Sequence, residues 1–146
     1  MDVIDEFKGK YYFLSNFYSA PVMYQGIKYQ NNEAAFQAMK VTDKSIHSEF
    51  SDLPPNLAKR KGRRVKLRRD WEELKEMFMY EIVKAKFEQN DHLKNKLLQT
   101  GESILIEGNT WGDKIWGVCN GVGENKLGKI LMKVRNELKE ASDGTE

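Results

Sequence analysis

Residues 13–40 read FLSNFYSAPVMYQGIKYQNNEAAFQAMK, and this stretch predicts a β-hairpin that leads directly into a helix. Gly26 lies between the short runs PVMY and IKY, and a glycine between two such runs favours a tight turn joining two strands. Asn31 or Asn32 is a suitable N-cap, and the EAAFQAMK run that follows consists largely of good helix formers. We therefore expect a hairpin over residues 21–29 and a helix over residues 31–40.

More helices are predicted in the middle of the chain. Prolines 54 and 55 are typical of a helix start, and Gly62 is a natural end for that helix. A longer helix begins at Asp70, with Glu73 in the capping-box position. Its apolar residues recur every three or four positions and predict a buried stripe: Trp71, Leu74, Phe78, Ile82 and Ala85.

The C-terminal part continues this pattern. Asp91 is expected to cap a helix that Gly101 closes, and residues 103–107 predict a short strand. From Glu124 a last helix places its apolar residues on one face: Leu127, Ile130, Leu131, Val134 and Leu138. The prediction is a small, single α+β domain over residues 1–146, mostly helical with a few short strands. Its core covers about residues 7–139, and an acidic tail over residues 140–146 is expected to fray.

Composition excludes several classes of protein. The 146 residues are 40% hydrophobic and 32% charged, which suits one globular domain and does not suit a disordered chain. No run of 18 apolar residues could span a membrane, and the opening MDVIDEFKGK resembles neither a secretory nor a transit peptide. One cysteine and two distant histidines predict neither a disulfide framework nor a metal site. We expect a cytoplasmic protein without a cofactor.

Positive charge is concentrated in one strip. The formal net charge is only +2, yet residues 59–69 read KRKGRRVKLRR. Arginine binds phosphate through two parallel hydrogen bonds, so some of these side chains are expected to bind phosphate groups of a small ligand or of a polymer end. The alternative is a solvated loop and helix end without a ligand.

The predicted helix 31–40 carries a carboxylate, an amide and an amine. Glu33 and Lys40 are seven residues apart, so two turns of helix place them on nearly the same side, with Gln37 between them. These groups suit acid–base and nucleophilic chemistry. The alternative is an ordinary solvated helix face.

Two aromatic segments are further predicted sites. Phe13, Ser15, Asn16 and Phe17 combine a stacking wall with polar groups, although a core-facing aromatic turn explains the same pattern. The glycine-rich loop 108–117 offers stacking and ribose-binding groups, although a tight turn anchored by buried tryptophans is the alternative; its predicted binding residues are Trp111, Asp113, Trp116 and Gly117. The run 120–125 then leads into the last helix, whose N-terminal amides could accept a phosphate.

Three blocks of the chain resemble the YbiA-like, or NADAR, family in their order. They are FLSNFYSAPVMYQGIKYQNNEAAFQAMK, then GRRVKLRRDWEELKEMFMYEIVKAKFEQNDHLKNKLLQTGESILIE, then DKIWG followed by GENKLGKILMKVRNEL. The resemblance covers about residues 7–139. It implies a small α+β fold and an enzyme that cleaves N-glycosidic bonds of ribosylated amines. Two branches of the family imply different substrates: a ribosylamino-pyrimidine phosphate of early riboflavin biosynthesis, or guanine ADP-ribosylated in nucleic acid.

The resemblance also implies roles for particular residues. The family's catalytic glutamate falls on Glu33, and the lysine that closes its FQAxK motif falls on Lys40. Gly62 and Arg63 match the family's GR pair, which implies a phosphate contact by Arg63, with Arg64 or Arg68. Lys40 either forms a Schiff base with the sugar or only orients Glu33. The positions of Ala34 and Asn32 depart from the histidine and serine that many members carry. If that change disables turnover, the alternative is a non-catalytic module that binds ADP-ribose or NAD.

Overall fold

The structure is a computed structural model that describes residues 2–143, and it divides the chain into two units. The hairpin unit consists of residues 16–90, and the terminal unit combines the N-terminal segment up to Ser15 with the chain from Asp91 onward. The prediction of a mainly helical α+β fold with a few short strands is confirmed. Each unit is described by itself below.

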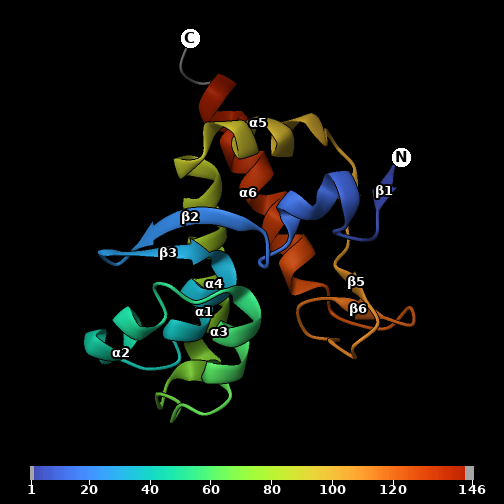
Figure 1. The fold of residues 1–146 in the computed structure, drawn as a ribbon. Coiled ribbons are helices and arrows are strands. Elements are labelled where there is room, and N and C mark those ends of the chain that lie inside the picture. The colour runs from blue at the N-terminus through green and yellow to red at the C-terminus, as the bar shows by residue number, and fades with distance from the viewer. Residues whose placement is uncertain (1, 144–146) are drawn as a thin grey trace. The chain divides into compact units, whose positions relative to one another are not determined.

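The hairpin unit begins with the predicted hairpin. Strands β2 (Ser19–Tyr24) and β3 (Ile27–Asn31) pair antiparallel, and Tyr24 lies opposite Ile27. Gln25 and Gly26 make the turn with φ angles of 49° and 84°, a conformation that glycine adopts without steric cost. Figure 1 shows the two strands side by side, with helix α1 (Asn32–Ala38) following β3.

Three more helices complete this unit: α2 (Lys44–Glu49), α3 (Pro55–Gly62) and α4 (Trp71–Gln89). Helix α1 packs against both α3 and α4, and strand β2 packs against α4. Helix α2 was not predicted, although Asp43 marks its start by accepting hydrogen bonds from the amide and the hydroxyl of Ser45. The predicted ends of α3, at Pro55 and Gly62, are confirmed.

The core of the hairpin unit contains the aromatic residues predicted from the stripe of α4. Trp71, Phe78 and Ile82 are buried, and Leu74 and Ala85 are half-buried. The Trp71 ring lies 5.1 Å from the Phe36 ring and 6.2 Å from the Phe78 ring, measured between centroids. The predicted capping box is wrong, because Asp70 binds the Arg68 guanidinium at 2.7 Å and makes no side-chain cap.

A buried lysine interrupts the apolar face of α4. Lys86 is 1% exposed, and its amine lies 5.6 Å from the centroid of the Tyr18 ring and 5.1 Å from that of Phe87. Burial disfavours the charged ammonium and lowers the pKa of Lys86 to about 7. The aromatic faces partly offset that cost because they attract a cation.

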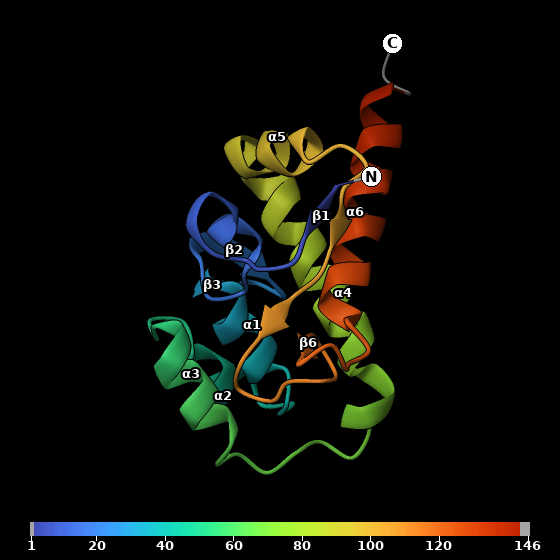
Figure 2. The same cartoon turned by 90° about the vertical axis from the view of Figure 1, so that its right-hand side faces the viewer.

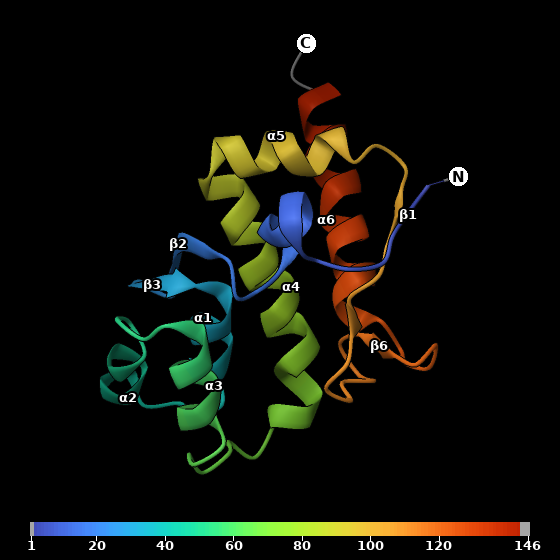
Figure 3. The ribbon, with the colours of Figure 1, turned by 45° about the vertical axis from the view of Figure 1, so that its right-hand side comes forward.

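The terminal unit is built around its long last helix. Strand β1 (Val3–Ile4) pairs parallel with β4 (Ile104–Leu105), and β4 packs against α6 (Lys126–Asp143), as Figure 2 shows. Helix α5 (Asp91–Gln99) packs across α6 (Figure 3). The remaining elements are the 3-10 helix η1 (Gly9–Leu14) and the parallel pair β5 (Gly108–Asn109) and β6 (Val118–Cys119).

Burial on α6 follows the predicted stripe: Leu127, Leu131, Val134 and Leu138 are buried, and Ile130 is half-buried. Three boundaries differ from prediction. The strand expected over 103–107 is only Ile104–Leu105, and the last helix begins at Lys126 instead of Glu124. Residues 140–143 of the acidic tail continue α6 instead of fraying, and residues 144–146 lie outside the described residues.

Among residues 2–143, no helix has the length and apolar character needed to cross a bilayer. The same residues contain no group of three or more histidine, cysteine, aspartate or glutamate side chains placed to bind a metal.

Candidate active site

The N-terminus of α1 is fixed by hydrogen bonds to the Asn31 side chain and to the backbone carbonyl of Asn16. Asn31 Oδ1 accepts a hydrogen bond from the Ala34 amide at 2.8 Å, as predicted for an N-cap, while its Nδ2 donates to the Leu53 carbonyl at 3.0 Å. The amide of Glu33 donates to the carbonyl of Asn16 at 3.0 Å. Glu33 is therefore held on rigid backbone in the first turn of the helix.

Glu33 and Gln37 form a buried pair on one side of α1. Their exposed fractions are 8% and 6%, and Gln37 Nε2 donates to Glu33 Oε2 at 2.6 Å. A hydrogen bond of this length to a carboxylate is strong and directional. The alternative of a solvated helix face is thus excluded for these two residues.

Lys40 does not lie on α1 with Glu33 and Gln37, as the predicted helix 31–40 would require. Helix α1 ends at Ala38, so Lys40 lies just beyond it, and its amide donates to the Gln37 carbonyl at 3.2 Å. The half-buried side chain turns to the C-terminus of α3, where Nζ donates to the Gly62 carbonyl at 3.3 Å. The helix end and α3, not two full turns of α1, set the position of Lys40.

The surroundings of Lys40 favour a reactive amine. Desolvation by burial lowers the pKa of Lys40, and the positive charges of Arg63 and Lys59 lower it further, while the charge of Glu33 acts in the opposite direction. Partial burial and cationic neighbours are the two conditions that a nucleophilic lysine requires.

Unfilled hydrogen-bond acceptors lie beside the Glu33–Gln37 pair. Asn32 Oδ1 and Gln37 Oε1 are buried and have no hydrogen-bond partner within the structure. Asn32 Nδ2 donates to Asn16 Oδ1 at 3.4 Å, and Asn16 Nδ2 approaches the sulfur of Met79 at 3.3 Å. Buried acceptors of this kind normally bind water or a ligand, so this corner of the unit suits a substrate rich in hydroxyl or amino donors.

The cations of the basic strip divide into two kinds. Arg63 is exposed, at the end of α3 beside Lys40, and Lys59 lies with its amine 5.8 Å from the centroid of the Phe17 ring. Arg68 instead binds Asp70 and stacks 5.1 Å from the centroid of the Phe78 ring. Of the three arginines predicted to contact phosphate, Arg63 and Arg64 are exposed, whereas Arg68 is half-buried.

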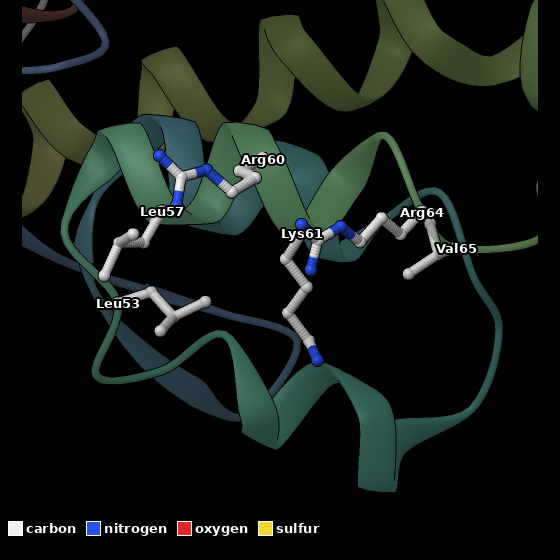
Figure 4. Close-up of a pocket in the computed structure, with 6 residues that line it drawn as sticks. All are labelled: Leu53, Leu57, Arg60, Lys61, Arg64 and Val65. Atoms are coloured by element: carbon white, nitrogen blue, oxygen red, sulfur yellow. The ribbon is translucent and has the colours of Figure 1, made fainter.

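A groove lies beside α3, between that helix and the segment that precedes it. It encloses about 470 Å³ and is lined by three cations and three apolar side chains: Leu53, Leu57, Arg60, Lys61, Arg64 and Val65 (Figure 4). Lys61 is paired with Glu49 at 2.7 Å. The groove suits an anion, but none of its lining residues is Glu33 or Lys40.

The predicted site residues of the terminal unit are held by contacts of their own. Phe13 is buried, and the Lys96 amine lies 4.9 Å from the centroid of its ring, so the core-facing alternative describes Phe13 correctly. Ser15 is half-buried and follows η1, where its amide donates to the Tyr12 carbonyl at 2.9 Å.

In the glycine-rich loop, polar atoms hold the turn. Asp113 Oδ1 accepts hydrogen bonds from the amides of Ile115 and Trp116 at 3.1 and 2.9 Å. Asn109 Oδ1 accepts from the Asp113 amide at 3.0 Å, and Asn109 Nδ2 donates to the Asp113 carbonyl at 2.8 Å. Only part of the Asp113 carboxylate therefore remains for the predicted ribose contact.

The tryptophans and Gly117 of this loop differ in exposure and in packing. Trp111 is 58% exposed and Trp116 is half-buried, so buried tryptophans do not anchor the turn. Gly117 has a packing role, because a Cβ there would overlap Glu107 and lie 2.7 Å from Asn109 Nδ2.

The N-terminus of α6 is not a phosphate site. The amides of residues 124–127 donate to the carbonyls of Lys114, Gly117, Ile115 and Trp116, at 2.8, 3.2, 3.1 and 2.9 Å in that order. The preceding loop therefore occupies the donors that a phosphate would need, which makes the prediction for the run 120–125 wrong.

One group of the predicted residues belongs to the hairpin unit: Asn16, Phe17, Glu33, Gln37, Lys40, Arg63 and Arg68. The other group belongs to the terminal unit: Phe13, Ser15, Trp111, Asp113, Trp116 and Gly117. That both groups line one pocket, with Glu33 and Trp116 facing the same ligand, stays a prediction. The sequence did not predict a role for Lys59 or for the side-chain amide of Asn32. For Lys59, the available signal was its position four residues before Arg63, which follows the last residue of α3.

The fold and the site define a small α+β protein that carries a buried carboxylate–amide pair beside a lysine of lowered pKa. The NADAR domain family matches residues 4–139, and the chain belongs to this family. N-glycosidase YbiA of Shigella flexneri serotype 5b (strain 8401) is 40% identical over 128 residues, which cover 85% of this chain and 79% of that protein. The expected family is confirmed.

A solved structure and a second relative also match this chain. The NMR structure of the Escherichia coli protein YbiA matches with a TM-score of 0.88 and 33% identity, covering 99% of this chain and 89% of that one. A Vibrio vulnificus protein, riboflavin biosynthesis protein VVA0006, is 34% identical over 132 residues, which cover 88% of this chain and 36% of its own.

Proposed function

We propose that this protein is an N-glycosidase that hydrolyses the bond between ribose and an exocyclic amine, with a ribosylamino-pyrimidine phosphate of early riboflavin biosynthesis as the substrate. The class of enzyme, a hydrolase of N-glycosyl bonds, is confirmed by the relatives named N-glycosidase YbiA. The riboflavin-related names of other relatives support the choice of substrate.

The observation that carries the proposal is the meeting of Lys40 with the Glu33–Gln37 pair. A buried carboxylate held by an amide at 2.6 Å is a fixed proton acceptor and donor. A lysine of lowered pKa is an amine that is neutral in a larger fraction of molecules. Cleavage of an N-glycosyl bond can use both functions, the first at the leaving nitrogen and the second at the anomeric carbon.

In the proposed mechanism, the sugar ring opens to an imine between the anomeric carbon and the exocyclic nitrogen. The neutral Lys40 amine attacks that carbon and forms a new carbon–nitrogen bond, while the bond to the exocyclic nitrogen breaks. Glu33 relays the two protons of the Lys40 amine to the leaving nitrogen, which departs as the free exocyclic amine and leaves Lys40 as an imine of the sugar. Water then adds to the lysine imine with Glu33 as the base, which releases the sugar aldehyde and regenerates the Lys40 amine.

If Lys40 serves only to orient Glu33, water attacks the anomeric carbon directly, and Glu33 moves the same protons. Binding roles follow from the same site. Arg63 holds the phosphate, Asn16 and Gln37 bind ribose or base donors, and Phe17 stacks on the heterocycle. From the terminal unit, we propose Ser15, Trp111, Asp113, Trp116 and Gly117 as further substrate contacts, whereas Phe13 is a core residue. We propose Arg68 as a brace for the phosphate-binding segment.

A second candidate substrate is favoured by the groove beside α3. Its three cations, Arg60, Lys61 and Arg64, add positive charge to the surface beside α3. A guanine that is ADP-ribosylated within nucleic acid would place neighbouring phosphates there. This alternative predicts that log KM rises linearly with log salt, because each neutralised phosphate releases condensed counterions.

Mass spectrometry of products, after incubation with each of two substrates, tests the proposal. Release of ribose 5-phosphate from the ribosylamino-pyrimidine phosphate supports the first substrate, and release of ADP-ribose from modified guanine in DNA supports the second. Calorimetric binding of ADP-ribose without product from either substrate contradicts both and favours the non-catalytic module.

A further inference from the structure

Gly62 is a glycine whose backbone does not require glycine. It is the last residue of α3, it is buried, and it is absent from the residues with positive φ. Alanine is a better helix former than glycine at such a position. The reason for a glycine here therefore lies in what its missing side chain leaves room for.

The room is filled by Gln37. A Cβ atom built on Gly62 would overlap Gln37 Oε1 and lie 2.6 Å from Gln37 Cδ and 3.1 Å from Gln37 Cβ. These atoms belong to the same amide that donates to Glu33 Oε2. The bare Cα of Gly62 is thus the surface against which the Gln37 amide rests while it holds Glu33.

The backbone carbonyl of Gly62 binds Lys40. The Gly62 carbonyl accepts the hydrogen bond from Lys40 Nζ at 3.3 Å. One residue of α3 therefore contacts the amide that orients the carboxylate and the amine that faces it. Close packing transmits small displacements at such a point, because the neighbours have no space in which to relax.

We propose that Gly62 is a positioning residue of the active site. Through its contact with the Gln37 amide it fixes the position of Glu33, and through its own carbonyl it fixes the position of Lys40. This inference rests on the proposed function and adds a residue that touches no substrate atom. Gly62→Ala should displace the flexible end of Gln37 and leave the fold intact. Because misplacement by about 1 Å can cost 10²-fold in rate, kcat should fall by about 10–10²-fold, with KM changed by less than about 3-fold.

A double-mutant cycle separates this role from a general structural effect. Gln37→Ala removes Oε1 and Cδ, the two atoms nearest to the new Cβ, and keeps only the Gln37 Cβ at 3.1 Å. Adding Gly62→Ala to Gln37→Ala should therefore lower kcat by less than about 2-fold further. Asn56→Ala is the matched control, because it also replaces a weak helix former in α3 but is exposed. It should keep wild-type kcat. Additive losses in the cycle, or wild-type kcat in Gly62→Ala, would overturn the inference.

A second measurement does not depend on activity. In NMR spectra, the Gln37 side-chain amide should be shifted and protected from exchange by its bond to Glu33, in the wild type and in Asn56→Ala but not in Gly62→Ala. If Gly62→Ala does not fold, recovery of folding in the Gly62→Ala, Gln37→Ala double variant supports the contact, and failure of the double variant to fold contradicts it.

The two proposals fail in different ways. A wild-type protein that cleaves neither substrate contradicts the proposed function, whatever the NMR result. A wild-type protein that is active, with an unchanged Gln37 amide in Gly62→Ala, contradicts the role of Gly62 alone.

Discussion

The end of α1 and the glycine-rich loop 108–117 are both rich in polar and aromatic residues, yet the two regions use their polar atoms differently. In the first, Gln37 donates to Glu33, and acceptors on Asn32 and Gln37 remain unfilled. In the second, Asp113 and Asn109 bond to the loop's own backbone. The difference teaches that a helix satisfies its backbone internally and leaves side chains for chemistry, whereas an irregular loop needs side chains to satisfy its backbone.

The largest expected effect concerns the α1 region. Glu33→Gln keeps nearly the same shape but cannot accept a proton near neutral pH, so turnover should fall by at least about 10²-fold. Binding of ribose 5-phosphate should change little, because Arg63 and its neighbours are untouched. Steady-state kinetics measures turnover, and calorimetry measures binding of ribose 5-phosphate. Near-wild-type turnover would show that the polar groups of α1 are not used for catalysis.

Lys40 offers a test with a pH dependence. Borohydride added during turnover should trap a sugar adduct on Lys40, and Lys40→Ala should give none. The amine attacks only when neutral, so trapping should increase as the pH rises through the Lys40 pKa. Because that pKa lies below its usual 10.5, the midpoint should lie below 10.5 as well. Peptide mapping must place the adduct on Lys40 and not on Lys86; no adduct on the active wild type would show that Lys40 only orients.

Lys86 supplies a buried amine outside the proposed chemistry. Its pKa is about 7 when folded and near 10.5 when unfolded, so the unfolded chain binds more protons between these values. The free energy of unfolding should therefore rise with pH in that window, by about 1 kcal/mol per pH unit from this group. Denaturant unfolding at pH 7, 8 and 9 measures it. The rise should be smaller in Lys86→Met, and equal slopes in the two proteins would contradict the assignment.

Asp113 tests the loop side of the comparison. Asp113→Ala leaves the amides of Ile115 and Trp116 without their acceptor and should lower the free energy of unfolding by about 1–2 kcal/mol. Asp113→Asn keeps an acceptor oxygen and should unfold like the wild type. Thermal denaturation measures both. If Asp113→Asn also raises KM by more than about 10-fold at unchanged stability, the carboxylate binds substrate as proposed, in addition to holding the loop.

The smallest effect on stability is expected at Trp111, which is 58% exposed. Trp111→Ala should change the free energy of unfolding by less than about 0.5 kcal/mol, as surface substitutions usually do. A rise in KM would then come from lost stacking on the base, and KM and stability measured on the same preparation separate the two. A loss well above 0.5 kcal/mol would mean that Trp111 anchors the loop.

Local sequence signals determined most of the secondary structure. The hairpin turn at Gly26, the cap at Asn31, the start of α3 at Pro55 and the stripes of α4 and α6 each depend on residues within a few positions of one another. Such signals are readable because backbone geometry and capping act over one or two helical turns. The same locality explains why Glu33 and Gln37, one helical turn apart, were placed correctly on one face.

Tertiary structure alone decided which polar groups are available. Nothing near Lys40 in the chain shows that its amine binds the carbonyl of Gly62, that Arg63 and Lys59 lower its pKa, or that Arg68 is held by Asp70 and Phe78. The same holds for the amides of α6, which the preceding loop occupies. Burial and hydrogen-bond partners arise from segments distant in sequence, and the free energy of a charged or polar group depends on those partners more than on its neighbours in the chain.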